Sequence, residues 1–305
     1  ALFSGLVLIT IGCGLFSPNS FSAYCKKYLR TPELMDSGLS IFYTVVNIGA
    51  VLGTFIIGLS RSNFAIGFGI CSFILLAAMV LAFFIEKPEQ EEIPVDVEKK
   101  QNISVPYVLI AIMLSGIFWF MVDYANNGIV YLETNFMDTY SQRFNVIWSA
   151  FNGVFITISG VVACIIWSFF DYSKLLKIII GFFMTAIAYA VLVIVPHTPS
   201  GFVAILMMFS AFIFSIAEIH VGPVFYSIIA RYSNPKYLAI MISLSFVPYR
   251  LFIFIYDLFS NDPHLGFMPL VISALTIAAI GIALLIFLLV KHKEKATELI
   301  SEQQV

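Results

Sequence analysis

The chain alternates long apolar stretches with short polar ones. A helix needs about 20 largely apolar residues to cross the hydrocarbon core of a bilayer. Stretches of about this length cover residues 1–25, 37–58, 63–86, 104–132, 145–170, 175–195, 201–231, 238–258 and 267–290. Lipid offers no partner for free backbone N–H and C=O groups, and the alternating pattern of a membrane barrel is absent. The pattern therefore predicts an all-α transmembrane bundle with nine spans.

One connection between these stretches is long and polar. Residues 87–103 read KPEQEEIPVDVEKKQNI, and such a segment cannot lie in hydrocarbon. It is predicted to be a solvated linker between three spans in residues 1–86 and six spans in residues 104–290, with a polar tail at 291–305. A linker followed by six spans is typical of transporters built from two six-helix halves. On this interpretation the first three helices of the N-terminal half precede residue 1; a genuine nine-span protein is the alternative.

The amino-acid composition indicates which solvent surrounds the protein. Of the 305 residues, 60% are hydrophobic and 11% are charged, whereas roughly a quarter of the residues of a soluble domain are charged. So few charges cannot cover the surface of the protein in water, and the lipid bilayer is the expected surrounding. The net charge of −2 offers no basic surface for nucleic acid.

The cationic residues predict the orientation, because cytoplasmic flanks of membrane helices are enriched in Lys and Arg. Arg61 and Arg143 fall at one end of the predicted bundle. Thirteen cations fall at the other end: Lys26, Lys27, Arg30, Lys87, Lys99, Lys100, Lys174, Lys177, Arg231, Lys236, Lys291, Lys293 and Lys295. The linker and the C-terminus are therefore predicted to be cytoplasmic, in a plasma membrane such as the bacterial inner membrane.

Three charged residues lie inside predicted spans, where each costs roughly 2.5–3.5 kcal/mol on insertion scales. They are Asp123, Glu218 and Arg250. Glu218 and Arg250 each lie sixteen residues from a predicted turn at Asn234, so they reach a similar depth on neighbouring helices. An intramembrane ion pair is the hypothesis. A packing role and a role in handling substrate or protons are both left open.

Polar groups and helix breakers also gather inside the spans. Asp123 is followed by Asn126 and Asn127, and a carboxylate in such a patch can carry a proton. The others are Ser17, Pro18, Asn19, Asn47, Asn152, Gly222 and Pro223. A single polar residue in a span often only joins two helices. Several together favour a polar central cavity, because freed backbone groups are tolerated where they line one.

The sequence offers little support for a metal site or a catalytic site. The four cysteines (Cys13, Cys25, Cys71 and Cys164) show no paired spacing and are interpreted as small apolar packing residues. His220 has no further ligands nearby in the sequence and is interpreted as a packing or hydrogen-bonding residue. No metal or organic cofactor is expected, and without a cluster of His, Asp and Ser we do not expect an enzyme.

Several segments, in order, resemble the proton-dependent oligopeptide transporters of the major facilitator superfamily. The segment SGLSIFYTVVNIGAVLG at 37–53 is the most specific. The other segments are GCGLFSPNSFSAYCKKYL at 12–29, FWFMVDYANNG at 118–128, FNGVFI at 151–156 and AEIHVGPVFYSIIARYSNPKYLAIMIS at 217–243. The resemblance covers nearly the whole chain.

The resemblance implies alternating access, with inward proton flow driving the uptake of di- and tripeptides by a monomer. It implies that the substrate cavity is lined by Asn47, Asn152, Glu218, Tyr43 and Ser17. Glu218 would meet the amino group of the peptide, and Asp123 together with Glu218 would couple transport to protons.

The sequence departs from the family at three positions. Ser17 replaces a Lys of the family, Tyr124 a Gln and Ser245 a Trp; Arg250 is a candidate replacement for the lost cation. The resemblance implies di- and tripeptides as substrates, and the three departures widen the expected class to related small zwitterions. The alternatives are a major-facilitator carrier for amino acids or organic anions, and a non-transporting membrane receptor or scaffold.

Overall fold

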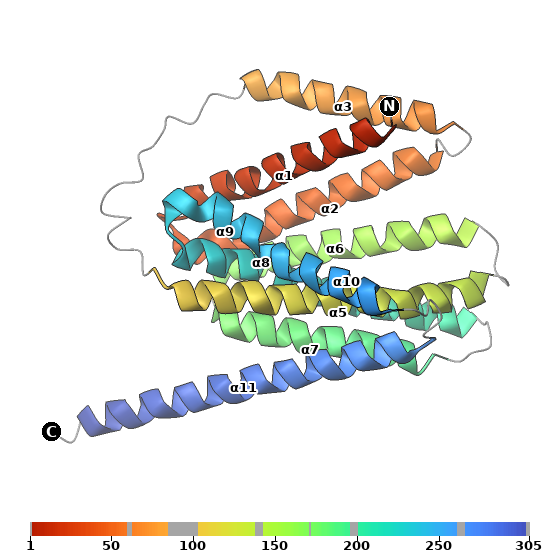
Figure 1. Ribbon diagram of the computed structural model, residues 1–305. Coiled ribbons are helices and arrows are strands. Elements are labelled where there is room, and N and C mark those ends of the chain that lie inside the picture. Colours follow the sequence, from red (N-terminus) through yellow and green to blue (C-terminus); the bar gives the residue numbers. More distant parts are fainter. Residues whose placement is uncertain are drawn as a thin grey trace.

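A computed structural model describes residues 2–59, 63–84, 103–137, 143–170, 172–195, 201–260 and 266–302. Every regular element in these ranges is helical, which confirms the predicted all-α class (Figure 1). The elements are α1 (Leu2–Lys27), η1 (Pro32–Leu34), α2 (Met35–Leu59), α3 (Phe64–Phe84), α5 (Val105–Met137), α6 (Arg143–Phe169), α7 (Lys174–Val193), α8 (Gly201–Tyr232), η2 (Pro235–Tyr237), α9 (Leu238–Ser245), α10 (Val247–Phe259) and α11 (Met268–Glu302).

Successive long helices run in opposite directions (Figure 1). Consequently α1, α3, α6, α8 and α11 end, and α2, α5 and α7 begin, at the same end of the bundle, here called the linker end. Within the described residues, seven segments are long and apolar enough to cross a membrane, while α3 and α6 contain the shorter apolar stretches Ala65–Leu81 and Gly153–Phe169. Each of the nine predicted spans thus coincides with helix. The predicted linker lies outside the described residues, except Ile103.

One predicted span is not a single helix. The stretch predicted as one helix over 238–258 is interrupted at Phe246, between α9 and α10. Pro248 occupies the first turn of α10. Because proline has no N–H to donate to the preceding turn, the helix restarts there. The predicted turn before this span is confirmed, since the Asn234 side chain accepts a hydrogen bond from the Lys236 N–H at 2.8 Å and caps η2.

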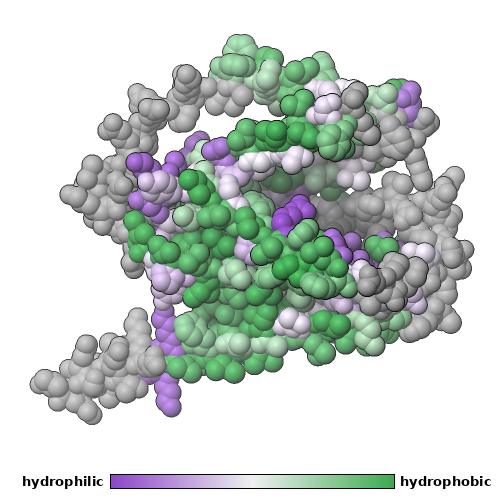
Figure 2. All heavy atoms as spheres, in the orientation of Figure 1, coloured by the Kyte–Doolittle hydropathy of each residue, from purple (hydrophilic) through white to green (hydrophobic). Residues whose placement is uncertain are grey.

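Helix α8 lies at the centre of the packing. It contacts α2, α5, α6, α7 and α9, while α2 packs mainly on α6 and α8. The lateral surface is strongly apolar (Figure 2). Phe3, Phe83 and Phe259 are about 80% exposed, an arrangement that lipid solvates and water does not. Figure 2 also shows hydrophilic atoms in the hollow between the α1–α2 pair and α10.

The α2–α6 contact depends on small residues. A Cβ on Gly153 would collide with Val51, and a Cβ on Gly160 would collide with the Thr44 hydroxyl. The two glycines are seven residues apart and lie on one helix face, so they let the helix backbones approach closely.

We expect Gly160→Leu to separate α2 from α6 and to lower the melting temperature in detergent, because overpacking typically costs about 1–3 kcal/mol. The matched control is Gly49→Ala in α2, where an added Cβ meets nothing within 4 Å. Thermal unfolding of both variants measures the difference. Equal melting temperatures would contradict the close α2–α6 contact.

Candidate functional site

A buried carboxylate lies where α2 meets α8. The Tyr43 hydroxyl of α2 donates a hydrogen bond of 2.6 Å to Glu218 Oε1 of α8. Glu218 is 9% exposed. The hydrogen bond joins the helices that precede the predicted linker to those that follow it.

Glycine on α8 makes room for this contact. Gly222 lies one turn after Glu218, and a Cβ there would be 3.0 Å from Tyr43 Cε2. The bare face of Gly222 therefore lets the Tyr43 ring lie against the α8 backbone. One turn along α2, the Asn47 side-chain amide donates to the Tyr43 carbonyl at 2.9 Å. The structure thus brings together Tyr43, Asn47 and Glu218, three of the five residues predicted to bind substrate.

The predicted ion pair between Glu218 and Arg250 is wrong. Among the described residues, the ion pairs involve Asp36 with Lys174 and Lys177, and neither Glu218 nor Arg250 takes part in one. Arg250 is exposed and its guanidinium lies 5.1 Å from the centre of the Tyr249 ring. The two residues were matched in depth alone. Since the helix restarts after Phe246 and α10 packs mainly on α5, an equal distance from the turn does not bring Arg250 to Glu218.

Asp123 borders a cavity of about 380 Å³ between α5, α7, α8 and α10. The cavity is also lined by Asn126, Glu133 and Tyr249. Tyr189 of α7 is a further, buried lining residue. The two predicted proton-coupling carboxylates thus lie in different surroundings, Asp123 at this cavity and Glu218 at the contact with Tyr43.

Two predicted substrate residues are not joined to this group by described contacts. Ser17 is exposed on α1, one turn before Phe21, whose ring lies 4.4 Å from Phe42 and 4.6 Å from Tyr226. Asn152 is in α6, but its side chain lies outside the described part of the structure.

Sequence reasoning missed a second polar group at the α2 interface. Asp36, at the start of α2 and 1% exposed, forms ion pairs with Lys174 and Lys177 of α7. Lys174 also donates to Ser227 Oγ of α8 at 2.6 Å. Lys177, itself 1% exposed, lies 4.7 Å from the centre of the Trp167 ring. We call Asp36, Lys174 and Lys177 the Asp36 cluster.

A second contact at the linker end supports the Asp36 cluster. Ser37 is hydrogen-bonded to Ser168 Oγ at 2.7 Å, and donates to the Cys164 carbonyl at 3.2 Å. Polar contacts thus hold α2 against α6 and α7 at this end. The sequence did hold a signal for the Asp36 cluster, because Asp36, Lys174 and Lys177 are all predicted to lie at the same end of the bundle.

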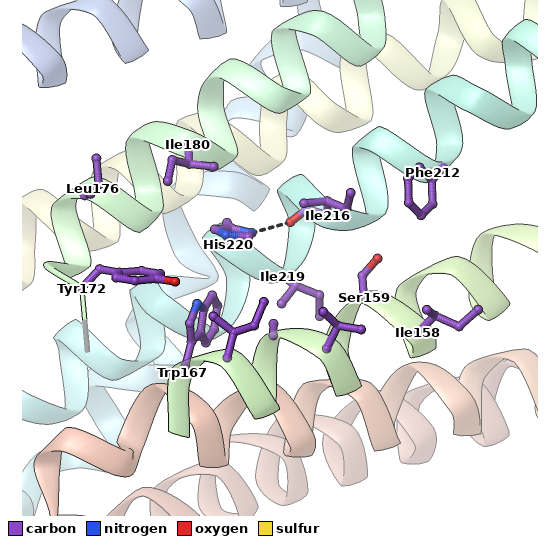
Figure 3. A pocket seen from close by; sticks show the side chains of 13 residues that line it. Ile158, Ser159, Trp167, Tyr172, Leu176, Ile180, Phe212, Ile216, Ile219 and His220 are labelled. Carbon is purple, nitrogen blue, oxygen red and sulfur yellow. Dashed lines mark hydrogen bonds between the residues drawn. The ribbon is translucent and has the colours of Figure 1, made fainter. Parts of the chain in front are cut away.

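His220 has the structural role that was predicted for it. Its Nδ1 is 2.8 Å from the Ile216 carbonyl, and its ring packs edge-to-face on Trp167 at 5.3 Å. Figure 3 shows both residues beside a cavity of about 450 Å³ between α6, α7 and α8. The walls of this cavity are mostly aliphatic and aromatic, so it lacks the convergent polar groups of a substrate site.

Comparisons with known proteins bear on this arrangement. Residues 1–256 match the family profile of the Major Facilitator Superfamily. Over 125 residues the chain is 30% identical to a protein of Bacillus subtilis (strain 168) described as "Uncharacterized transporter YclF"; the match covers 38% of this chain and 25% of the relative.

Two further relatives are described as "Di-/tripeptide transporter". The one from Lactococcus lactis subsp. cremoris is 26% identical over 127 residues, which is 39% of this chain and 26% of the relative. The one from Lactococcus lactis subsp. lactis (strain IL1403) is 24% identical over 121 residues, which is 37% of this chain and 24% of the relative. The matches therefore cover about a quarter of the length of each of these curated relatives.

Proposed function

Because the chain belongs to the Major Facilitator Superfamily, a family of membrane transporters, we propose that it takes up di- and tripeptides or related small zwitterions by proton-coupled alternating access. The observation that carries this proposal is the buried Glu218 carboxylate, held by the neutral Tyr43 hydroxyl at the α2–α8 contact. Within the described residues no Lys or Arg forms an ion pair with Glu218. A buried carboxylate needs a partner, and the ammonium group of a substrate can supply one.

The neighbouring groups suit a small peptide. Asn47 lies one turn from Tyr43, and Asn152 directly precedes Gly153 of α6, which packs on α2. Amide side chains both donate and accept hydrogen bonds, as peptide backbones require. Ser17 offers a hydroxyl, rather than a cation, to the rest of the substrate. Two relatives described as di-/tripeptide transporters favour the same substrate class.

Proton coupling is assigned to Asp123 and Glu218. When an ammonium group binds Glu218, the carboxylate is held in its charged form and gives up its proton, which Asp123 takes up. Asp123 borders a cavity that Tyr189 of α7 also lines. In this proposal Asp123 releases that proton on the inner side. Glu218 takes up a new proton from the outer side before the next substrate binds, so one proton moves inward with each substrate.

The Asp36 cluster is the proposed closure at the linker end. It holds α2 against α7 and, through Ser227, against α8. Opening this end requires the three charges to separate into water, which solvates them once they are exposed. The excess of Lys and Arg at this end favours a cytoplasmic position for it. The proposed location is a plasma membrane, and the protein is proposed to work as a monomer.

Uptake of a labelled dipeptide into vesicles tests the proposed function. The protein, expressed from its complete coding sequence, is reconstituted and given an inward proton gradient. We expect gradient-dependent accumulation that unlabelled di- and tripeptides compete away. Competition by amino acids but not by dipeptides would replace the proposed substrate class with amino acids, for which Ser17 in place of a family Lys is the supporting observation.

We expect Tyr43→Phe to raise the KM for dipeptide about tenfold while leaving the fold intact. Without the hydroxyl, Glu218 loses the donor that orients it and stabilises its charged form, a contribution of roughly 1–3 kcal/mol, so it binds an ammonium group less well. The matched control is Tyr131→Phe, a half-exposed tyrosine on α5 that packs on Phe267 at 5.3 Å; its KM should stay within about twofold. Equal KM values in the two variants would remove Tyr43 from the site.

A further inference from the structure

A third cavity opens at the linker end, among α5, α7, α8 and α11. Its volume is about 660 Å³, within the range of roughly 300–1,000 Å³ that ligand pockets occupy. It is separate in its lining from the Glu218 site and from the Asp123 cavity, except that Lys174 belongs both to its wall and to the Asp36 cluster.

The cavity is divided by polarity along the membrane normal. Lys174, Arg231 and Lys291 line it near the helix ends, with His292 beside them. No Asp or Glu is among the described residues that line it. Leu114 and Leu284 belong to its apolar part. Lys291 is seven residues from Leu284 on α11, so the apolar part reaches roughly 10 Å into the bundle from the charged rim.

The cavity opens sideways toward lipid. Tyr107 and Phe287, both in its lining, are 50% and 53% exposed. The Tyr107 ring stacks on Tyr232 at 5.5 Å at the same wall. An aromatic pair at the level of helix ends is typical of the headgroup region. Figure 2 likewise shows hydrophilic atoms at the linker end.

We propose that this cavity is a binding site for an anionic phospholipid of the leaflet at the linker end. The phosphate lies on Lys174, Arg231 and Lys291, and an acyl chain lies against the apolar walls beneath them. Basic pockets between membrane helices bind anionic headgroups in this way. The site fits an amphipathic anion, because cationic side chains gather at its rim above apolar walls. Lys174 also pairs with Asp36. Sharing Lys174 places the headgroup beside the Asp36 cluster.

The test measures lipid binding to the purified protein by native mass spectrometry and by thermal stabilisation. Phosphatidylglycerol is compared with phosphatidylcholine of the same acyl chains and with glycerol phosphate. We expect stabilisation by phosphatidylglycerol alone. Each cation at the membrane surface contributes roughly a fivefold factor, so the double variant Arg231→Gln/Lys291→Gln should bind it about 25-fold more weakly.

The matched control is Lys27→Gln/Lys236→Gln, which removes two cations from the same end of the bundle but outside the cavity lining; it should bind phosphatidylglycerol as the wild type does. Leu284→Trp fills the apolar part without changing charge, and should weaken binding even if the double variant fails to fold. Equal stabilisation by phosphatidylcholine, equal stabilisation by glycerol phosphate, or a control variant as weak as the double variant would overturn the proposal.

Discussion

Glu218→Gln is expected to abolish proton-driven accumulation of dipeptide and to raise the KM in exchange assays about 10- to 100-fold. A hydrogen bond to a charged group contributes roughly 1.5–3 kcal/mol, and the glutamine amide keeps the shape of the carboxylate without its charge. Tyr43 Oη can still donate to the amide oxygen, so the contact between α2 and α8 should persist. Initial uptake rates at a series of external pH values measure the effect.

The control for this variant is Asp257→Asn, which neutralises an exposed carboxylate on α10. Its uptake should stay within about twofold of wild type. A merely structural role for Glu218 would lower the amount of folded protein without changing the pH dependence of the remaining uptake. Wild-type accumulation by Glu218→Gln would remove the carboxylate from the mechanism.

Asp36→Asn is expected to have the second-largest effect. It leaves Lys177, which is 1% exposed, and Lys174 without their carboxylate. Removing one partner of a buried ion pair costs roughly 3–5 kcal/mol, so the linker end should loosen. The melting temperature should fall, and a water-soluble maleimide should label Cys164 faster, because the Ser37 contact with Cys164 depends on α2 staying close to α6. Labelling is measured with the other three cysteines replaced by Ser.

The double variant Asp36→Asn/Lys177→Met provides the rescue. Replacing buried charges by apolar groups of similar volume is often neutral, so part of the lost stability should return. The maleimide rate should also fall back toward the wild-type value. A melting temperature unchanged in Asp36→Asn, or lowered further in the double variant, would show that the Asp36 cluster does not hold the linker end closed.

The helices were predictable because the bilayer sets their length and lipid leaves the backbone no other structure. The exception is the interruption at Phe246. Hydropathy does not detect it, because Pro248 is apolar enough for a span but has no N–H for the helix hydrogen bond. The close contacts of Gly153 and Gly160 could not be predicted, because their partners depend on which helices are neighbours. Hydropathy carries no information on that choice.

The candidate site was only partly predictable, for a related reason. The depth of Glu218 and Arg250 followed from residue counts, but the rotation of each helix did not, and the hypothesis of an ion pair failed there. Family resemblance supplied Tyr43, Asn47 and Glu218 together, and two described contacts now join them. Asp36 was missed because it lies at the edge of an apolar stretch, where charged residues are common. Its role is evident only once the fold places Lys174 and Lys177 beside it.

The central claim is that Glu218 binds the amino group of a small peptide during proton-driven uptake. The most direct measurement compares a labelled dipeptide with its N-acetylated analogue in the same vesicles under the same inward proton gradient, for the wild type and for Glu218→Gln. The account predicts accumulation of the free dipeptide by the wild type, and little transport in the other three combinations. Equal uptake of both compounds by the wild type would contradict it.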